Sequence, residues 1–142
     1  MSSRKNVLSQ LAIVLAEVTQ IKTVVRSLIQ DFDITQYSQS QLPLVVVPEP
    51  LEETFNEMTD QRSVMELASI LRIYFVFWGI SPDAVYEALV TAIRNKLGNN
   101  FTLNDTTIIC RVAGVSIILG TMPVYDFTIR LEMKYYLRET DV

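Results

Sequence analysis

The stretch from Val124 to Arg138 constrains the fold of this chain more than any other. Apolar and polar residues alternate over nearly its whole length, which is the period of a β-strand with one buried and one solvated face. At roughly 3.3 Å per residue the run would extend about 45 Å, well beyond the typical strand of about 5–6 residues. We therefore expect that the strand bends, or that part of it pairs beyond its own domain.

The rest of the chain predicts an α+β domain spanning residues 1–142, because helices and strands follow one another without an internal repeat. An amphipathic helix is expected over residues 6–29, packing either across the sheet or as a seam against a neighbouring subunit. Residues 48–63 hold five acids before Arg62 and read as an acidic loop. Residues 107–138 are expected to form a long antiparallel hairpin, broken near Ala113 and Gly114.

Two further elements lie between the acidic loop and the hairpin. The apolar run from Ile70 to Trp78 predicts a strand in the middle of the sheet, covered on both faces. Ser81, Pro82 and Asp83 suit the start of a helix that Gly98 would end, and this helix is expected to cross over between strands. The predicted fold is a mixed, mostly antiparallel sheet with two helices packed on one face and a long C-terminal β-hairpin.

The residue types present exclude most kinds of catalytic chemistry. The chain has no histidine and a single cysteine, Cys110, which we expect to be a small packing residue in a strand. It has no glycine-rich phosphate loop, and its acids lack the spacing of a calcium loop. We therefore predict a protein that is not an enzyme, with no catalytic residue, cofactor or metal site. Three arginines on strands could clamp an anion or form ion pairs with Glu66, Asp126 or Glu132, namely Arg72, Arg111 and Arg130.

The charge and the apolar content point to protein partners. A net charge of −4 argues against a nucleic-acid-binding face. Hydrophobic residues make up 49% of the chain, yet the longest uncharged stretch is too short and too rich in glycine and proline to span a membrane. The N-terminus does not read as a signal peptide. The sequence therefore predicts no membrane contact, and apolar surface that is buried between copies or against other proteins.

The order of these elements resembles that of the tail terminator proteins of long-tailed phages, the family of the lambda tail terminator. The shared features are an N-terminal helix, a strand from Leu44 to Val47 that ends at Pro48, an acidic loop, the aromatic strand Ile70–Trp78, a helix opened by Ser81-Pro82-Asp83-Ala84 and closed by Leu97-Gly98, and the final strand from Val124. The resemblance covers nearly the whole chain. The N-terminal helix departs from it, being longer than that family needs.

The resemblance implies a structural protein of the virion tail or neck, assembled in the host cytoplasm. Such a protein forms a homo-hexameric ring that contacts the tail tube protein and a neck or head-completion protein, while DNA passes through without specific binding. The expected subunit interface holds Val7, Leu11, Val14, Val18, Tyr125, Phe127 and Arg130. The expected tube- or lumen-facing loop holds Glu49, Glu52, Glu53, Phe55, Glu57 and Asp60. A non-viral oligomeric ligand-binding or regulatory module is the alternative, and a hydrolase or transferase would need a pocket of converging polar groups.

Overall fold

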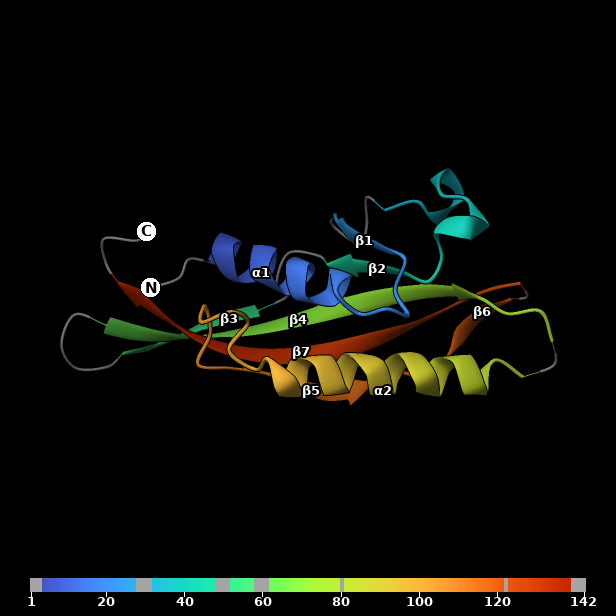
Figure 1. The fold of residues 1–142 in the computed structure, drawn as a ribbon. Coiled ribbons are helices and arrows are strands. Elements are labelled where there is room, and N and C mark those ends of the chain that lie inside the picture. Colours follow the sequence, from blue (N-terminus) through green and yellow to red (C-terminus); the bar gives the residue numbers. More distant parts are fainter. Residues whose placement is uncertain are drawn as a thin grey trace.

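Two paired strands of 15 residues each form the centre of the molecule. The computed structural model describes residues 4–27, 32–47, 52–57, 62–79, 81–121 and 123–138. Strand β7 (Val124–Arg138) pairs antiparallel with β4 (Arg62–Val76) along its entire length, from Arg138 opposite Arg62 to Val124 opposite Val76 (Figure 1). The predicted final strand is therefore confirmed, and its surplus length is paired within its own chain.

The sheet extends on both sides of this central pair. Its order is β1 (Thr23–Arg26), β2 (Leu44–Val47), β4, β7 and β5 (Ile109–Val115), with β3 (Glu52–Glu57) paired to β4 and β6 (Leu119–Thr121) paired to β7. Only β1 and β2 run parallel, whereas every other pairing is antiparallel. The sheet is therefore mixed and mostly antiparallel, as predicted.

Both helices cover the same face of the sheet. On β4 the odd-numbered residues from Met65 to Phe75 are buried, and the even-numbered ones are half-buried. The buried face forms one core with helix α1 (Arg4–Ala16), helix α2 (Asp83–Asn99) and the odd-numbered residues of β7. Because one face is covered by helices and the sheet is mostly antiparallel, the chain has the predicted α+β architecture.

The N-terminal helix is shorter than the predicted span of residues 6–29. It ends at Ala16, and the chain then turns and enters β1, which lies parallel to β2. The predicted end was wrong because apolar residues continue at intervals of three and four beyond Ala16. Val18 and Ile21 belong to that pattern and are buried in the same core as the helix, but they are not helical. The run Thr23-Val24-Val25 is β-branched and suits a pleated strand beside Leu44–Val47.

The predicted acidic loop over residues 48–63 contains a strand. Residues Glu52–Glu57 form β3, which pairs antiparallel with Ser63–Ala68 of β4. The segment shows no apolar alternation, so its own sequence gave no strand signal. The long partner strand supplies the backbone pairing that orders it, which is a tertiary effect.

Helix α2 connects β4 to β5 and crosses over β7, as predicted. Pro82 rather than Ser81 occupies the N-cap position, and the Ser81 Oγ donates a hydrogen bond of 3.1 Å to Asp83 Oδ2. The helix continues through Gly98 to Asn99, one residue beyond the predicted stop. Since β4 and β5 are both antiparallel to β7, they run parallel to each other, and the connection spans the intervening strand.

The hairpin predicted over residues 107–138 is present, with its first arm in two pieces. Strands β5 and β6 both return along β7, and the register shifts between Val112 and Gly114, near the predicted break. Gly120, in the middle of β6, has φ +98°, and a Cβ added there would lie 2.9 Å from the Val124 carbonyl oxygen. This left-handed conformation and the close backbone approach both require glycine.

The described residues cover the second face of the sheet at one end only. There Phe32, Tyr37, Leu42 and neighbouring residues pack on Leu44, Val46 and Tyr74. The prediction that Ile70–Trp78 would be covered on both faces therefore holds for the end of β4 near Tyr74 and not for Ile70. Trp78 lies beyond β4 and is 71% exposed. The remainder of this face, which we call the open face, carries the polar side chains of β4, β5 and β7.

Candidate functional site

Cross-strand ion pairs line the open face. Arg111 Nη2 lies 2.7 Å from Glu132 Oε2, and Lys134 Nζ lies 3.4 Å from Glu66 Oε1. In both cases the two residues stand directly opposite each other on adjacent strands. Nearer the covered end, Arg72 Nε lies 3.1 Å from Asp126 Oδ2. The prediction that Arg72 and Arg111 form ion pairs with strand carboxylates is confirmed.

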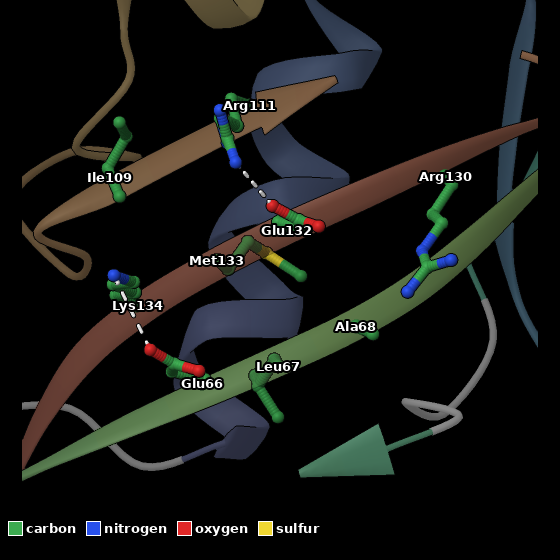
Figure 2. Close-up of a pocket in the computed structure, with 9 residues that line it drawn as sticks. All are labelled: Glu66, Leu67, Ala68, Ile109, Arg111, Arg130, Glu132, Met133 and Lys134. Carbon is green, nitrogen blue, oxygen red and sulfur yellow. Dashed lines mark hydrogen bonds and ion pairs between the residues drawn. The ribbon is translucent and has the colours of Figure 1, made fainter. Parts of the chain in front are cut away.

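A hollow of about 390 Å³ lies between these pairs (Figure 2). Around it stand four charged side chains, those of Arg111, Glu132, Lys134 and Glu66. On β4, Ala68 leaves the hollow open, because its methyl group fills little of the space between β4 and β7. The set of lining residues is completed by Leu67, Ile109, Arg130 and Met133.

Arg130 is the unbalanced charge of the hollow. Its side chain extends from β7 across the hollow toward β4, as Figure 2 shows, and its strand partner on β4 is the apolar Ile70. No carboxylate of the described residues forms an ion pair with it. The hollow thus holds three cations, Arg111, Arg130 and Lys134, against two carboxylates, Glu66 and Glu132. The arrangement leaves a guanidinium with free donors that suits a carboxylate.

The second feature is the apolar edge, defined here as residues 109–119 of β5, β6 and their connection. Within the described sheet, β5 is the last strand in the order and has β7 on one side only. Four of the large apolar side chains that are exposed lie on this edge, namely Ile109, Val115, Ile117 and Leu119, at 37%, 37%, 77% and 51%. Exposed apolar groups beside a strand with one free side are typical of a surface that pairs with another chain.

The connection between β5 and β6 is held in a defined shape. The Thr128 amide donates to Ser116 Oγ at 2.8 Å, and the Ser116 amide donates to the Thr128 carbonyl at 2.9 Å. The Tyr86 hydroxyl of α2 donates to the Ser116 carbonyl at 3.0 Å. Because these bonds fix residue 116, the neighbouring Ile117 is presented to solvent in one position.

Five of the predicted interface residues belong to the chain's own core. Val7, Leu11, Val14 and Phe127 have no exposed surface, and Val18 has 5%. A side chain without exposed surface has none left for a second subunit, so the burial of these five, complete for four and nearly so for Val18, speaks against a place in the subunit interface. Helix α1 therefore packs across the sheet, which was the simpler of the two interpretations.

The other two predicted interface residues lie at different depths. Tyr125 is half-buried and stacks on Phe75 with ring centroids 5.8 Å apart. Arg130 is exposed and points into the hollow. Of the predicted interface set, only Arg130 stands on the candidate site.

The predicted tube- or lumen-facing residues fall largely outside the described side chains. Glu52, Glu53, Phe55 and Glu57 lie on β3, opposite Ala68, Leu67, Met65 and Ser63 of β4. Glu49 and Asp60 lie outside the described residues. The prediction that these residues face a tube or a lumen stays a prediction.

Sequence reasoning missed the apolar edge. A signal existed, because the run from Val112 to Leu119 is apolar without strict alternation and therefore offers more apolar side chains than one buried face can use. The hollow gave no such signal, since it depends on the alignment of Ala68, Glu132 and Arg111 on three strands.

Cys110 lies on the helix-covered face of β5, where it is 2% exposed. Burial raises the pKa of its thiol to about 12, so the thiol stays protonated at neutral pH and is a poor nucleophile. Among the residues that the structure describes, no group of three or more Cys, Asp or Glu side chains is placed to hold a metal ion.

Comparison with known proteins gives this chain no relative: no family model matches it, and no curated protein matches it. Within the described ranges, no helix has the length and apolar character needed to cross a membrane.

Proposed function

We propose that this chain is a structural assembly protein of a phage virion, which forms a ring that terminates the tail tube and joins it to the neck or head. The observation that carries the proposal is the apolar edge. Ile117, in the connection between β5 and β6, and Leu119, on β6, are 77% and 51% exposed beside the free side of β5. Exposing such an apolar surface to water is unfavourable for a monomer. Pairing of that edge with another copy would bury it.

The edge also suits a ring. When it meets a different surface of the neighbouring copy, repeated contacts of that kind close into a ring if the rotation allows. The net charge of −4 would repel DNA phosphates from the ring. We infer that the protein acts by binding other proteins and not by catalysis, with copies of itself, the tail tube protein and a neck or head-completion protein as its partners.

The family resemblance supports the viral setting. One departure from it was a predicted N-terminal helix longer than the family needs, and helix α1 ends at Ala16, well short of that predicted span. The order of the elements from α1 to β7 remains compatible with a tail terminator from the virion tail or neck.

Self-association tests the edge. Sedimentation velocity and negative-stain imaging of the wild type should show rings with six-fold averages, and Ile117→Glu or Leu119→Glu should give monomers. Ile13→Glu is the matched control, because Ile13 is 51% exposed on α1, away from the edge, and should leave the rings intact. Rings in all three variants would contradict the role of the edge.

Tube termination tests the viral role. Tubes assembled from the cognate tail tube protein should stop growing and carry a terminal ring when this protein is added, and Ile117→Glu should abolish this. Tubes of unchanged length with no bound protein would contradict the proposal.

The hollow favours a second candidate, an oligomeric module that binds a small ligand or regulates a partner. About 390 Å³ with a free guanidinium can hold a small carboxylate. This candidate predicts a dimer or tetramer whose melting temperature rises with such a metabolite. A six-fold ring whose melting temperature does not respond would exclude it.

A further inference from the structure

The open face carries a small excess of positive charge, although the net charge of the chain is −4. On β4, β5 and β7, the described side chains of this face include four cations and three carboxylates. Three of the cations each form an ion pair with one of the carboxylates. The excess charge is therefore that of the fourth cation, Arg130, and this is where an anion is favoured.

The strand neighbours of Arg130 leave space around its guanidinium. Its partner on β4 is Ile70, and its partner on β5 is Gly114. Neither residue carries a group that can accept a hydrogen bond from the guanidinium through its side chain. A Cβ added to Gly114 would meet no atom within 4 Å, so the space over that position is open.

The two ion pairs of the hollow limit the charge of a ligand. Arg111 and Lys134 are compensated by Glu132 and Glu66 at 2.7 and 3.4 Å, so the hollow has a balance of one positive charge. A ligand with a single negative charge neutralises that balance, whereas Glu66 and Glu132 would repel a second negative charge. A planar carboxylate also matches the fork of donors on a guanidinium.

The hollow has the size and the apolar surface for a compact acid. Its volume of about 390 Å³ falls within the range of small-molecule sites. Figure 2 places Arg130 toward one end and Lys134 with Ile109 toward the other, with Ala68 between them on β4. Ile109 and the methyl group of Ala68 provide apolar contacts for the body of a ligand whose carboxylate lies at Arg130.

We propose that the hollow is a binding site for a compact carboxylate of single charge, which Arg130 holds by a bidentate pair of hydrogen bonds. This inference rests on the hollow of the second candidate function and specifies its ligand, and it does not require the proposed ring. The carboxylate belongs either to a free acid or to an acidic side chain of a bound protein, and the probes below distinguish these two sources.

Nuclear magnetic resonance titrations of the purified chain test the site. Sodium butyrate should shift the side-chain Nε–H signal of Arg130 and the backbone amide signals of Ala68 and Glu132, with a Kd in the millimolar range that suits so small a ligand. Uncharged n-butanol should shift none of them. Inorganic phosphate at about pH 8 should bind about tenfold more weakly than butyrate, because most of it carries two charges. Equal binding of phosphate and butyrate would overturn the proposed selectivity.

Three variants locate the bound carboxylate. Arg130→Gln should weaken butyrate binding about tenfold, because it removes the charge and the donor fork. Ala68→Leu keeps every charge but fills the hollow, and it should weaken binding to a similar extent. Arg94→Gln is the control, since Arg94 is exposed on α2 and the charge change is the same. Butyrate binding of wild-type strength in both hollow variants would overturn the inference.

A blocked tripeptide, acetyl-Gly-Glu-Gly-amide, separates the two sources of the carboxylate. Tighter binding of the tripeptide than of butyrate would assign the site to a protein side chain, and the reverse order would assign it to a free acid. Rings that form without any binding of butyrate or tripeptide would overturn this inference and leave the proposed function intact. Carboxylate binding by a chain that forms no ring and does not bind the tube would refute the proposed function and support the inference.

Discussion

Ser69 places a hydroxyl in the apolar core. Its side chain is fully buried on the helix-covered face of β4, between Leu67 and Leu71, and its Oγ has no hydrogen-bond partner. A buried hydroxyl without a partner has lost its hydrogen bonds to water and has formed none within the protein, so its burial is unfavourable.

We therefore expect Ser69→Ala to stabilise the protein by about 1 kcal/mol, because it removes the unpaired polar atom and leaves only a small void. This corresponds to a rise in melting temperature of about 3 °C for a domain of this size. Thermal unfolding followed by circular dichroism measures the change, and a fall in melting temperature would contradict the assignment.

A second prediction at the residue scale concerns how the Cys110 thiol makes stability depend on pH. Its pKa rises from 9.0 to about 12 on folding because burial disfavours the thiolate. Between about pH 9 and pH 12 the unfolded chain ionises while the folded one does not, so this group lowers stability as pH rises across that range. Denaturant unfolding at several pH values should show the slope, and Cys110→Ala should make it shallower. Part of the slope should remain, because burial also raises the pKa of Tyr74. The folded protein should also resist iodoacetamide at pH 8, whereas the unfolded chain should react.

At the scale of the elements, one tyrosine joins helix α2 to the apolar edge. The Tyr86 hydroxyl donates to the Ser116 carbonyl at 3.0 Å, and its ring meets Phe127 edge-on at 4.8 Å. The hydroxyl fixes the connection between β5 and β6, whereas the ring belongs to the core beneath it.

Tyr86→Phe should therefore cost about 1 kcal/mol and speed amide exchange around Ser116 to Leu119, with α1 unchanged. Hydrogen exchange read by mass spectrometry locates the effect. Tyr125→Phe is a suitable control, because no hydrogen bond of the Tyr125 hydroxyl is found among the described residues, and it should change neither quantity much. Equal protection of the edge in both variants would show that the hydroxyl has no such role.

At the scale of the whole molecule, the net charge of −4 on each copy opposes the proposed self-association, and salt should reveal this. The Debye length falls from about 8 Å at physiological ionic strength to about 3 Å at 1 M. Self-association through the apolar edge should therefore strengthen as sodium chloride rises, because salt screens the repulsion between copies of like charge. Sedimentation velocity over a salt series measures the change, and weaker association at high salt would contradict the apolar edge as the main contact.

The local patterns of the sequence were sufficient for the central strands and for α2. The strict alternation of apolar and polar residues predicted which side chains of β7 face the core. Pro82, Asp83 and the apolar spacing predicted the bounds of α2 to within one residue at each end. Those signals are local, because they depend on the period of the backbone and on groups at the helix ends. That Arg72 and Arg111 form ion pairs with carboxylates among Glu66, Asp126 and Glu132 was also predicted from residue types, but only the structure shows which carboxylate each one binds.

Only the tertiary structure decided the rest. Val18 to Arg26 continues a helical spacing, yet strand β2 takes Thr23–Arg26 as a parallel neighbour, and β4 orders the acidic Glu52–Glu57 in the same way. The burial of Val7, Leu11 and Phe127 within the chain, and the hollow around Arg130, depend on which strands stand side by side. The local sequence determines which faces each segment can present. Strand pairing between distant segments determines which of those faces remain exposed, because the free energy of pairing comes from residues far apart in the chain.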